Sequence, residues 1–407
     1  MVFKKVDVCI IGSGIVGLAV GLRISKQFPN IKLLILDKED GVALHQTGHN
    51  SGVIHAGLYY PPGSYKAQWC TTGSKLLIDY CKNYDIPYEL SGKLVIAADS
   101  SEEKSLNDLY DRGVSNGVQG LRKLNRDQLT EIEPNVAGTS GIYSPNTGIV
   151  DYTKISESFA SNIIQGNAEI LTGCQVINIV SKNQDVLLET TKGDIESKTI
   201  INCAGLHADD IANKMDVDID VRIIPFRGEY YTVKPRNSLF IRGLIYPVPD
   251  PRFPFLGVHF TKRIDASIEA GPNAVLAFAR EGYKKTDFDI KELLGLLRFS
   301  GFWYMSFKYW RMGFDEQMRS ISKKLFVKSL QKLVPSINES DLISGGSGVR
   351  AQAVDRKGGI IQDFKIVQSS SAVHVLNAPS PAATSSLSIS QHIVDVAKKQ
   401  FGWVSIT

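Results

Sequence analysis

Residues 6–17 read VDVCIIGSGIVG, and this stretch decides the fold. An apolar, β-branched run ends at Ile11, glycines follow at positions 12, 14 and 17, and a helical pattern then extends to Lys26. A second apolar run ends in Asp37, about twenty positions after the last of these glycines. This order of strand, tight turn, helix and acidic residue predicts a dinucleotide-binding βαβ unit.

Each residue of the motif has a physical role in such a unit. Gly12 permits the tight turn, and Gly14 lets a pyrophosphate approach the N–H groups at the helix N-terminus. Gly17 allows the helix to pack closely on the strand, and Asp37 accepts hydrogen bonds from ribose hydroxyls. A purely structural turn remains the alternative, and the motif alone does not separate NAD from FAD.

A later segment favours FAD. Residues 198–205 form an apolar strand that closes on Ala204 and Gly205, whose small size suits a turn that returns the chain to the cofactor. The alternating pattern over residues 168–191 predicts a β-meander before this strand. Val176 in that meander is expected to face the adenine, with an ordinary place in the core as the alternative.

Composition and charge exclude other classes of protein. The 407 residues, 43% hydrophobic and 22% charged, fit a folded chain of two interleaved domains and exclude disordered and collagen-like chains. The 46 basic and 42 acidic residues give a net charge of +4, which does not indicate nucleic-acid binding.

The five cysteines are widely spaced without zinc-ligand spacing, so we expect a reducing compartment and no metal. No apolar run is long enough for a membrane span, and Asp7 argues against a signal peptide.

The block at residues 45–64, HQTGHNSGVIHAGLYYPPGS, carries a family resemblance. It resembles the L-2-hydroxyglutarate dehydrogenase/oxidase family, a branch of the glycine/D-amino-acid oxidase-like flavoproteins. Further matching blocks cover the rest of the chain: PFRGEYY at 225–231, LGVHFT at 256–261, AGPNA at 270–274, REGY at 280–283 and GVRAQ at 348–352.

The resemblance implies an α/β fold in which a Rossmann-like FAD-binding domain, with a parallel sheet and a β-meander, is interleaved with a mixed-sheet α+β substrate domain. It also implies FAD as the cofactor and oxidation of L-2-hydroxyglutarate to 2-oxoglutarate, with hydride transfer from C2 to flavin N5. Because the matching blocks alternate between the two parts, we assign residues 1–87, 148–219 and 330–407 to the FAD-binding domain, and residues 88–147 and 220–329 to the substrate domain.

Two polar segments are candidates for flavin contacts. In the loop from residue 47 to 52, Thr47, Asn50 and Ser51 offer hydrogen bonds to phosphate or ring, although a capped turn would show the same residues. Near the C-terminus, small residues and prolines precede an amphipathic stretch, so helical N–H groups are left free to face the flavin pyrimidine. The residues expected there are Ala382, Ala383 and Thr384.

Oxidation of a 2-hydroxy acid requires a base for the hydroxyl proton, and imidazole titrates in the useful range. His55 and His259 lie in matching blocks between apolar neighbours, so each is a candidate for the base or for a substrate hydrogen bond. A structural role is the alternative for both. The sequence does not decide between them.

Arg350 is the candidate for the substrate carboxylate, because a guanidinium can bind it through two hydrogen bonds. It follows the glycine-rich segment 344–349, in which we expect Gly348 to lie beside the cofactor. Related amine oxidases hold the carboxylate with an arginine in a Gly-x-Arg-Pro setting, whereas here Ala351 stands in place of proline, which leaves the loop shape open. A dicarboxylate also needs a second anion site, for which the candidates are Arg227, Arg280, Tyr230, Tyr59 and Thr261.

Residues 290–314 combine leucines and aromatic residues with Lys291, Arg298, Lys308 and Arg311. This segment is too charged to cross a bilayer, but it suits the lipid interface. A buried helix pair or a dimer contact is the alternative. A membrane contact would make a quinone the electron acceptor and would place a cytoplasmic protein on the inner face of the cell membrane. Without that contact, oxygen or a soluble carrier accepts the electrons.

Two other functions remain open at this point. The first is a glycine- or sarcosine-type amino-acid oxidase with the same fold. The second is a non-catalytic flavin-binding protein that docks on membranes.

Overall fold

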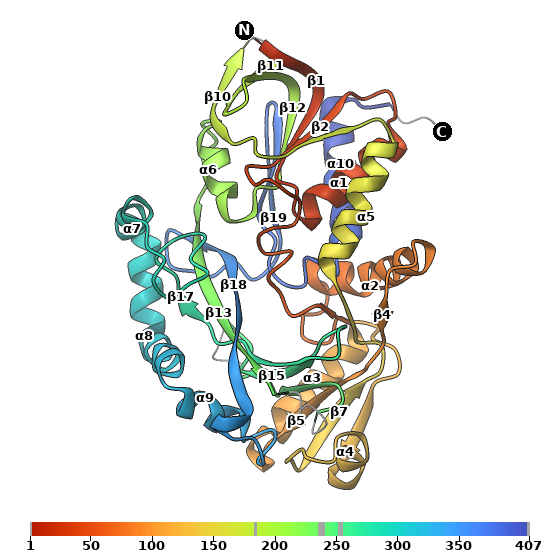
Figure 1. Cartoon of the computed structure of the whole chain (residues 1–407), viewed down its shortest axis with the longest axis vertical. Helices are drawn as coiled ribbons and strands as arrows, with labels where there is room; N and C mark the ends of the chain where they lie inside the picture. The colour runs from red at the N-terminus through yellow and green to blue at the C-terminus, as the bar shows by residue number, and fades with distance from the viewer. Residues whose placement is uncertain (1, 183–184, 235–240, 251–254, 405–407) are drawn as a thin grey trace.

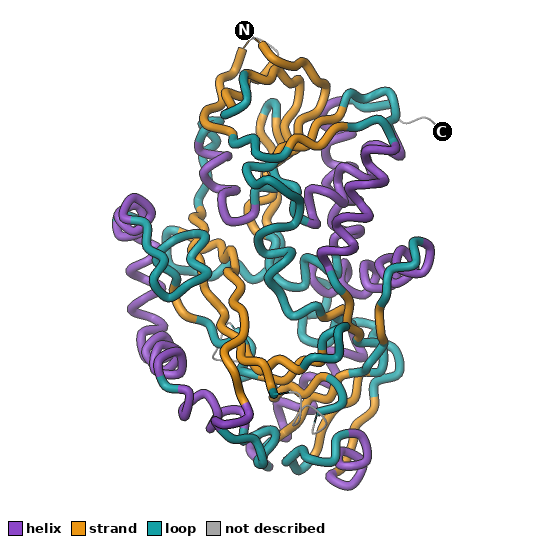
Figure 2. Tube along the Cα trace, viewed as in Figure 1, coloured by secondary structure: helices purple, strands orange, loops and turns teal. Residues whose placement is uncertain are grey.

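A computed structural model describes residues 2–182, 185–234, 241–250 and 255–404. Two large sheets lie toward opposite ends of the long axis, and the chain passes between them several times (Figures 1 and 2). A small sheet lies between the two in sequence and in space. Its strands are β3 (Val53–Ile54), β4 (Tyr88–Glu89) and β8 (Gly148–Val150).

The first sheet grows from β1 (Val2–Ile11), which pairs in parallel with β2 (Leu33–Leu36) and β12 (Asp194–Asn202). Because β1 is covered on both faces, its central residues Val8, Cys9 and Ile10 are fully buried. The remaining strands of this sheet are β9 (Glu169–Leu171), β10 (Val176–Lys182), β11 (Asp185–Thr190), β19 (Lys365–Ser369) and β20 (Ala372–Asn377).

The β-meander predicted from the alternating pattern is confirmed. Strands β10, β11 and β12 pair antiparallel in sequence, and β12 then runs parallel to β1. Long helices cover one face of the first sheet, as Figure 1 shows. They are α1 (Ile15–Gln27), α2 (Tyr65–Asn83), α5 (Tyr152–Gln165) and α10 (Ser386–Phe401), while the short α6 (Ala208–Asn213) packs beside the meander.

The second sheet has mixed directions, because β14 runs parallel to β5 and the other pairs within it are antiparallel. Its order is β17-β13-β16-β15-β14-β5-β7-β6, with β18 paired to β13. The strands are β5 (Lys93–Ala97), β6 (Arg122–Asn125), β7 (Ser140–Ser144), β13 (Val221–Val233), β14 (Leu244–Pro247), β15 (His259–Lys262), β16 (Ile268–Gly271), β17 (Val275–Leu276) and β18 (Leu342–Asp355).

Strand β18 corrects one sequence boundary. It lies within residues 330–407, which we assign to the FAD-binding domain, yet it pairs with β13 from Val221↔Asp355 to Val233↔Leu342. The error arose because a strand can leave one domain for the other's sheet without any local change in composition. The division into two domains otherwise stays a prediction.

The two faces of the second sheet have different neighbours. Leu94, Ile245 and Phe260 pack in one apolar cluster with α9 (Lys323–Leu330). Val95 and Tyr246 alternate with those residues and pack in a cluster that includes Val53 and Leu58, which belong to the predicted FAD-binding domain, called the FAD part below. The helices around this sheet are α3 (Glu103–Ser115), α4 (Arg126–Ile132), α7 (Ile290–Leu297) and α8 (Ser300–Ile321).

Candidate active site

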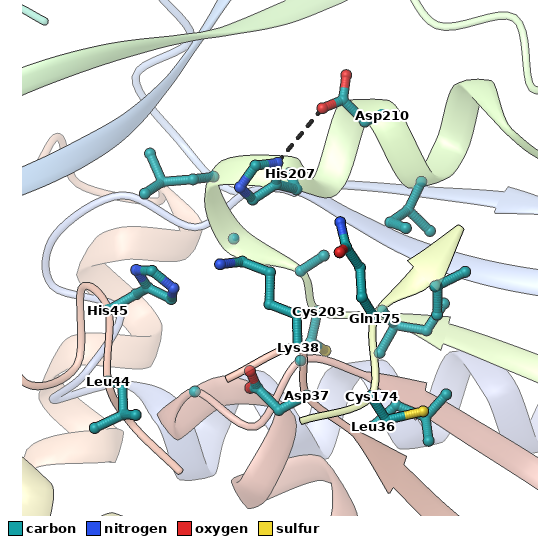
Figure 3. A pocket seen from close by; sticks show the side chains of 18 of the residues that line it. Leu36, Asp37, Lys38, Leu44, His45, Cys174, Gln175, Cys203, His207 and Asp210 are labelled. Atoms are coloured by element: carbon teal, nitrogen blue, oxygen red, sulfur yellow. Dashed lines mark ion pairs between the residues drawn. The ribbon is translucent and has the colours of Figure 1, made fainter. Parts of the chain in front are cut away.

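A cavity of about 820 Å³ lies at the C-terminal ends of β1, β2 and β12. In an open α/β sheet this edge is where nucleotides bind. The cavity brings together residues that the sequence singles out from five separate segments (Figure 3). They are Gly12, Gly14, Asp37, Thr47, Val176, Ala204 and Gly205.

The glycine turn has the shape that a pyrophosphate requires. Gly12 has a φ of 105°, and a Cβ there would lie 2.4 Å from the carbonyl oxygen of Cys203. Gly17 does not line the cavity, but its Cβ would lie 2.0 Å from the carbonyl oxygen of Gly12, which fits a packing role. Gly14 is the N-cap residue of α1 and supplies no side-chain cap, and a Cβ there would meet only the Thr47 hydroxyl, at 3.4 Å. The helix N-terminus is therefore open for an anion.

The acid and the polar loop are held by short hydrogen bonds. The Asp37 Oδ2 accepts from the backbone N–H of Ser13 at 2.7 Å and from its hydroxyl at 2.6 Å. The Thr47 hydroxyl accepts from the N–H of Ile15 at 3.0 Å. Asn50 is directed into its own loop, where its Oδ1 accepts from Gly52 N–H at 2.8 Å. Neither Asn50 nor the adjacent Ser51 lines the cavity, so their flavin contacts stay predictions.

An ion-pair network crosses the rim of the cavity. Lys38 lies between the carboxylates of Glu39 and Glu281, with its Nζ 2.6 Å from Glu281 Oε1. The His207 Nε2 lies 2.8 Å from Glu281, and the His45 Nε2 lies 2.9 Å from Glu39. Glu39, His45 and Glu281 are close enough to hold a metal ion, but the Lys38 ammonium already bridges the two carboxylates.

The network shifts the pKa of its members. The hydrogen bond from His207, followed by that from Lys38, lowers the pKa of Glu281 to about 2 against the opposing effect of burial. Burial lowers the pKa of His207, but Asp210 and Glu281 outweigh it and raise the pKa to about 9. Because Glu281 follows β17 and the other members belong to the FAD part, the network ties the two parts together.

A second group of residues lies on the face of the second sheet that packs toward the FAD part. Because β14 and β15 are paired at Ile245↔Phe260, Tyr246 and His259 are neighbours on the opposite face from that pair. Their rings stack with centroids 3.8 Å apart. His259 is close enough to His55, which directly follows β3, to affect the pKa of that residue.

His55 is held at the point where the two parts meet. Its backbone N–H donates to the Thr384 hydroxyl at 3.2 Å, and this hydroxyl also lies 2.8 Å from the hydroxyl of Tyr152. Burial, together with the positive charge of Lys93 and the nearby His259, lowers the pKa of His55 well below its ordinary value. The imidazole is therefore neutral near pH 7 and can accept a proton.

His259 is also neutral. Its Nδ1 lies 2.8 Å from the carbonyl oxygen of Gly257, which requires a proton on Nδ1 and leaves Nε2 as an acceptor. Burial lowers its pKa to about 3, and the positive charges of Lys93 and Arg350 act in the same direction. The structure thus brings both candidate histidines together.

Arg350 lies on β18 opposite Phe226, and its guanidinium carbon lies 5.3 Å from the ring of Phe255. Within the described ranges it forms no ion pair, so its charge is free for a ligand. The strand runs against the polar loop, because a Cβ on Gly348 would lie 2.2 Å from the carbonyl oxygen of His49. Ala351, at the position where the related motif has proline, uses its N–H to donate to Gln46 at 3.1 Å.

Two candidates for the second anion site are corrected. Arg280 is 3% exposed and is bound to Asp209 through both terminal nitrogens, with a further bond to Asp210 at 3.1 Å. Arg227 is bound to Glu229 through two nitrogens, at 3.1 and 3.0 Å. Both guanidinium charges are compensated by carboxylates, so neither is available to a substrate.

The other candidates lie near the histidines. Tyr230 and Arg350 are close enough that the arginine's charge affects the pKa of the tyrosine, which burial raises. Thr261 follows His259 by two residues and therefore shares its face of β15. The Tyr59 hydroxyl is buried without a hydrogen-bond partner in the described structure. Sequence reasoning missed a fourth neighbour, Lys93, although a lysine that begins the apolar run KLVIA is a signal that could have been noticed.

Comparison with known proteins defines the class. The family model described as FAD dependent oxidoreductase, DAO, matches residues 7–396, and the chain belongs to this family. FAD is accordingly its cofactor, and the open glycine turn and its cavity fit that group.

Particular relatives narrow the class. The chain is 50% identical over 396 residues to L-2-hydroxyglutarate dehydrogenase of Indibacter alkaliphilus, covering 97% of this chain and 99% of that protein. It is 41% identical over 389 residues to L-2-hydroxyglutarate dehydrogenase of Escherichia coli K12, covering 95% and 92%. These relatives confirm the family resemblance found in the sequence.

A solved structure shares the fold. An FAD-bound L-alpha-glycerophosphate oxidase from Mycoplasma pneumoniae has a TM-score of 0.81 and 21% sequence identity, with 100% of this chain and 97% of that chain covered. The likeness confirms the predicted Rossmann-like FAD-binding fold with its additional mixed sheet.

Two glycine substitutions separate cofactor binding from folding. Gly14→Ala adds a methyl group to the open helix N-terminus, so we expect FAD affinity to fall about tenfold or more while the apoprotein stays folded. Gly17→Ala forces a methyl group against the Gly12 carbonyl and should lower the free energy of unfolding by about 1–3 kcal/mol. FAD titration and apoprotein melting measure the two effects. Equal loss of stability in both variants would contradict this assignment.

The His207 network predicts a pH-dependent stability. The folded state raises the pKa of His207 from 6.5 to about 9, so its contribution is fully present below pH 6.5 and is lost as the pH rises through about 9. The difference in melting temperature between wild type and His207→Asn should therefore shrink over that interval. Glu281→Gln should remove most of the difference. A difference that stays constant with pH would exclude this role.

Proposed function

We propose that this protein uses FAD to oxidise L-2-hydroxyglutarate to 2-oxoglutarate. One observation carries the proposal: two imidazoles that are both neutral near pH 7 lie close to one another, and one of them, His259, is also close to Arg350, which has no carboxylate partner in the described part of the chain. A hydroxyl next to a carboxylate is a substrate that this combination of groups fits. The L-2-hydroxyglutarate dehydrogenases at 41–50% identity support the choice of substrate.

Each residue of this group would have a separate role in the reaction. Arg350 would hold the carboxylate on C1 through paired hydrogen bonds and thereby orient C2. His55 would accept the hydroxyl proton, because its imidazole is neutral and its backbone is fixed by Thr384. The Nε2 of His259 would accept a hydrogen bond and keep the hydroxyl aligned. FAD, when bound, supplies the two-electron acceptor for the hydride that leaves C2 as the carbonyl forms.

Anaerobic flavin reduction tests the reaction. We expect L-2-hydroxyglutarate to bleach the flavin and the D-enantiomer, glycine and sarcosine to leave it oxidised. His55→Asn should slow reduction by about 10²- to 10⁴-fold, because it removes the proton acceptor. His392→Asn, on α10 outside this group, serves as the control and should leave the rate unchanged. Reduction by glycine or sarcosine alone would replace this proposal by an amine oxidase, and no reduction by any of them would favour a non-catalytic flavoprotein.

The electron acceptor is a separate proposal, which rests on the outer surface of α8. The large side chains of Trp303, Phe307, Trp310 and Phe314 are spaced by four, three and four residues, and between 47% and 75% of each is exposed. The helix bends at Tyr309 and lies with α7 along the outer edge of the second sheet (Figure 1). Aromatic side chains so exposed are costly in water and favourable at lipid headgroup depth.

The charges beside these aromatic residues fit an anionic lipid surface. Lys308 and Arg311 alternate with them on the same helix. No described helix is long and apolar enough to cross a membrane. We therefore propose that α8 lies in the headgroup region of an anionic membrane, on the cytoplasmic side, and that the electrons pass to a quinone there.

Vesicle binding tests the membrane contact. We expect the holoenzyme to sediment with vesicles that contain phosphatidylglycerol, and less so as the salt concentration rises. Phe307→Ser with Trp310→Ser should abolish sedimentation, whereas Ile164→Ser, an exposed residue of α5, should not alter it. Flavin reoxidation by a quinone in the same vesicles should depend on the two aromatic residues. Reoxidation that is fast with dissolved oxygen and indifferent to vesicles would overturn this proposal.

A further inference from the structure

Lys93 is a buried lysine that none of the roles above uses. It is the first residue of β5, and only 2% of it is exposed. Val95 lies two residues further along the strand and packs with Tyr246 toward the FAD part, so Lys93 projects from the same face of the sheet. A lysine at such a position is rare unless something compensates its charge.

Aromatic rings rather than carboxylates surround the Lys93 ammonium. Its Nζ lies 4.1 Å from the ring centroid of Tyr246 and 5.0 Å from that of Tyr59. The backbone of Lys93 pairs with β14 and β7, but its side chain has no hydrogen bond or ion pair with another residue in the described ranges. Burial lowers its pKa from 10.5 to about 7, because the ring faces only partly replace the lost water. No anion compensates the charge of the protonated amine, and a bound carboxylate would raise the pKa and keep Lys93 protonated.

Lys93 belongs to the same group as the two histidines. Its positive charge lowers the pKa of both His55 and His259, and the effect of Arg350 reaches His259 as well. In the order of strands across the sheet, Lys93 on β5 and Arg350 on β18 lie on opposite sides of β14 and β15, which carry Tyr246 and His259. Two cations without partners thus flank the proposed proton acceptors.

This arrangement fits a substrate with a carboxylate at each end. A hydroxyl-bearing carbon between the two carboxylates would lie against the histidines while each cation holds one end. The other cations nearby fit less well, because Arg227 and Arg280 are bound to carboxylates and Lys66 is stabilised by Asp363. The buried Tyr59 hydroxyl, without a partner in the described structure, is available to donate to the same carboxylate oxygen.

We propose that Lys93 binds the carboxylate of the substrate that lies farther from the reacting carbon, and that it sets the preference for dicarboxylates. This inference rests on the proposed function, and it assigns a residue to the second anion site. Lys93 would be a binding residue rather than the base, because His55 and His259 already offer neutral acceptors.

Substrate discrimination tests the proposal. L-2-Hydroxyvalerate has the same chain length as L-2-hydroxyglutarate but ends in a methyl group, so it cannot use an anion site. We expect Lys93→Met to lower the ratio of kcat/KM between the dicarboxylate and this monocarboxylate by about 30- to 1000-fold, mainly through the dicarboxylate's KM. A parallel fall for both substrates, with an unchanged ratio, would overturn the proposal, because it would show a structural role.

Lys66→Met is the matched control. Lys66 also lies near His55 and has a pKa lowered by burial to about 8, so its removal changes the local charge in a similar way. We expect it to keep the dicarboxylate preference. A loss of preference that follows Lys66 instead of Lys93 would also overturn the assignment. FAD content and melting temperature establish that each variant is folded, and Lys93→Gln replaces Lys93→Met where the latter fails to fold.

Binding of glutarate separates this inference from the proposed reaction. Glutarate has both carboxylates but no hydroxyl, so it cannot be oxidised, and its binding is read from the perturbation of the flavin absorbance in the holoenzyme. We expect it to bind wild type more tightly than butyrate does, and Lys93→Met to remove this difference. If L-2-hydroxyglutarate fails to reduce the flavin while this pattern holds, only the reaction is wrong. If reduction occurs but Lys93→Met leaves glutarate binding unchanged, only the role of Lys93 is wrong.

Discussion

Positive charge without a compensating carboxylate in the described structure lies where the second sheet packs toward the FAD part, and the chemistry of the site depends on it. Lys93 and Arg350 are the sources of this charge, and His259 responds to both of them. Burial is the main reason that the pKa values of His55 and His259 are low, and a cation next to an imidazole adds to it because it disfavours a second positive charge. The same field attracts an anion. The cations therefore contribute both to the neutrality of the imidazoles and to the affinity for an anion.

In the nucleotide-binding half of the site, the binding surface is determined by backbone geometry rather than by side-chain charge. The turn at Gly12 passes so close to the end of β12 that no side chain fits, and Gly17 brings α1 against that turn. At the helix N-terminus Gly14 supplies no side-chain cap, and although Thr47 binds the N–H of Ile15, this end of α1 faces the cavity. Local sequence specifies such a turn almost completely, because a positive φ and a backbone contact both require glycine. The cavity residues predicted from the sequence accordingly came together, including Asp37 and Val176.

The substrate half was harder to predict, because its residues meet only through pairing between distant strands. Arg227 and Arg280 were reasonable candidates by residue type. However, Glu229 compensates the charge of Arg227, and Asp209 compensates that of Arg280. Asp209 is 71 residues from Arg280 in the sequence, so the second pairing could not be read from the local sequence. Lys93 was missed for the complementary reason. A lysine at the start of an apolar strand usually marks the strand's exposed end, and only the pairing of β5 with β14 shows that this one is buried between tyrosine rings. The placement of β18 in the second sheet was missed in the same way.

Strand β18 also relates the substrate site to the outer surface. It carries Arg350 in its central part and ends at Asp355, and α8 packs on this end: a Cβ on Gly301 would lie 2.0 Å from the Asp355 carbonyl oxygen. The buried Met305 holds the same helix against the sheet, while Phe307 and Trp310 are exposed. Because the contacts that seat α8 and the side chains that face outward are different residues, the membrane contact can be removed without moving the strand that carries Arg350. Loss of lipid binding and loss of substrate binding are thus separable properties of this fold.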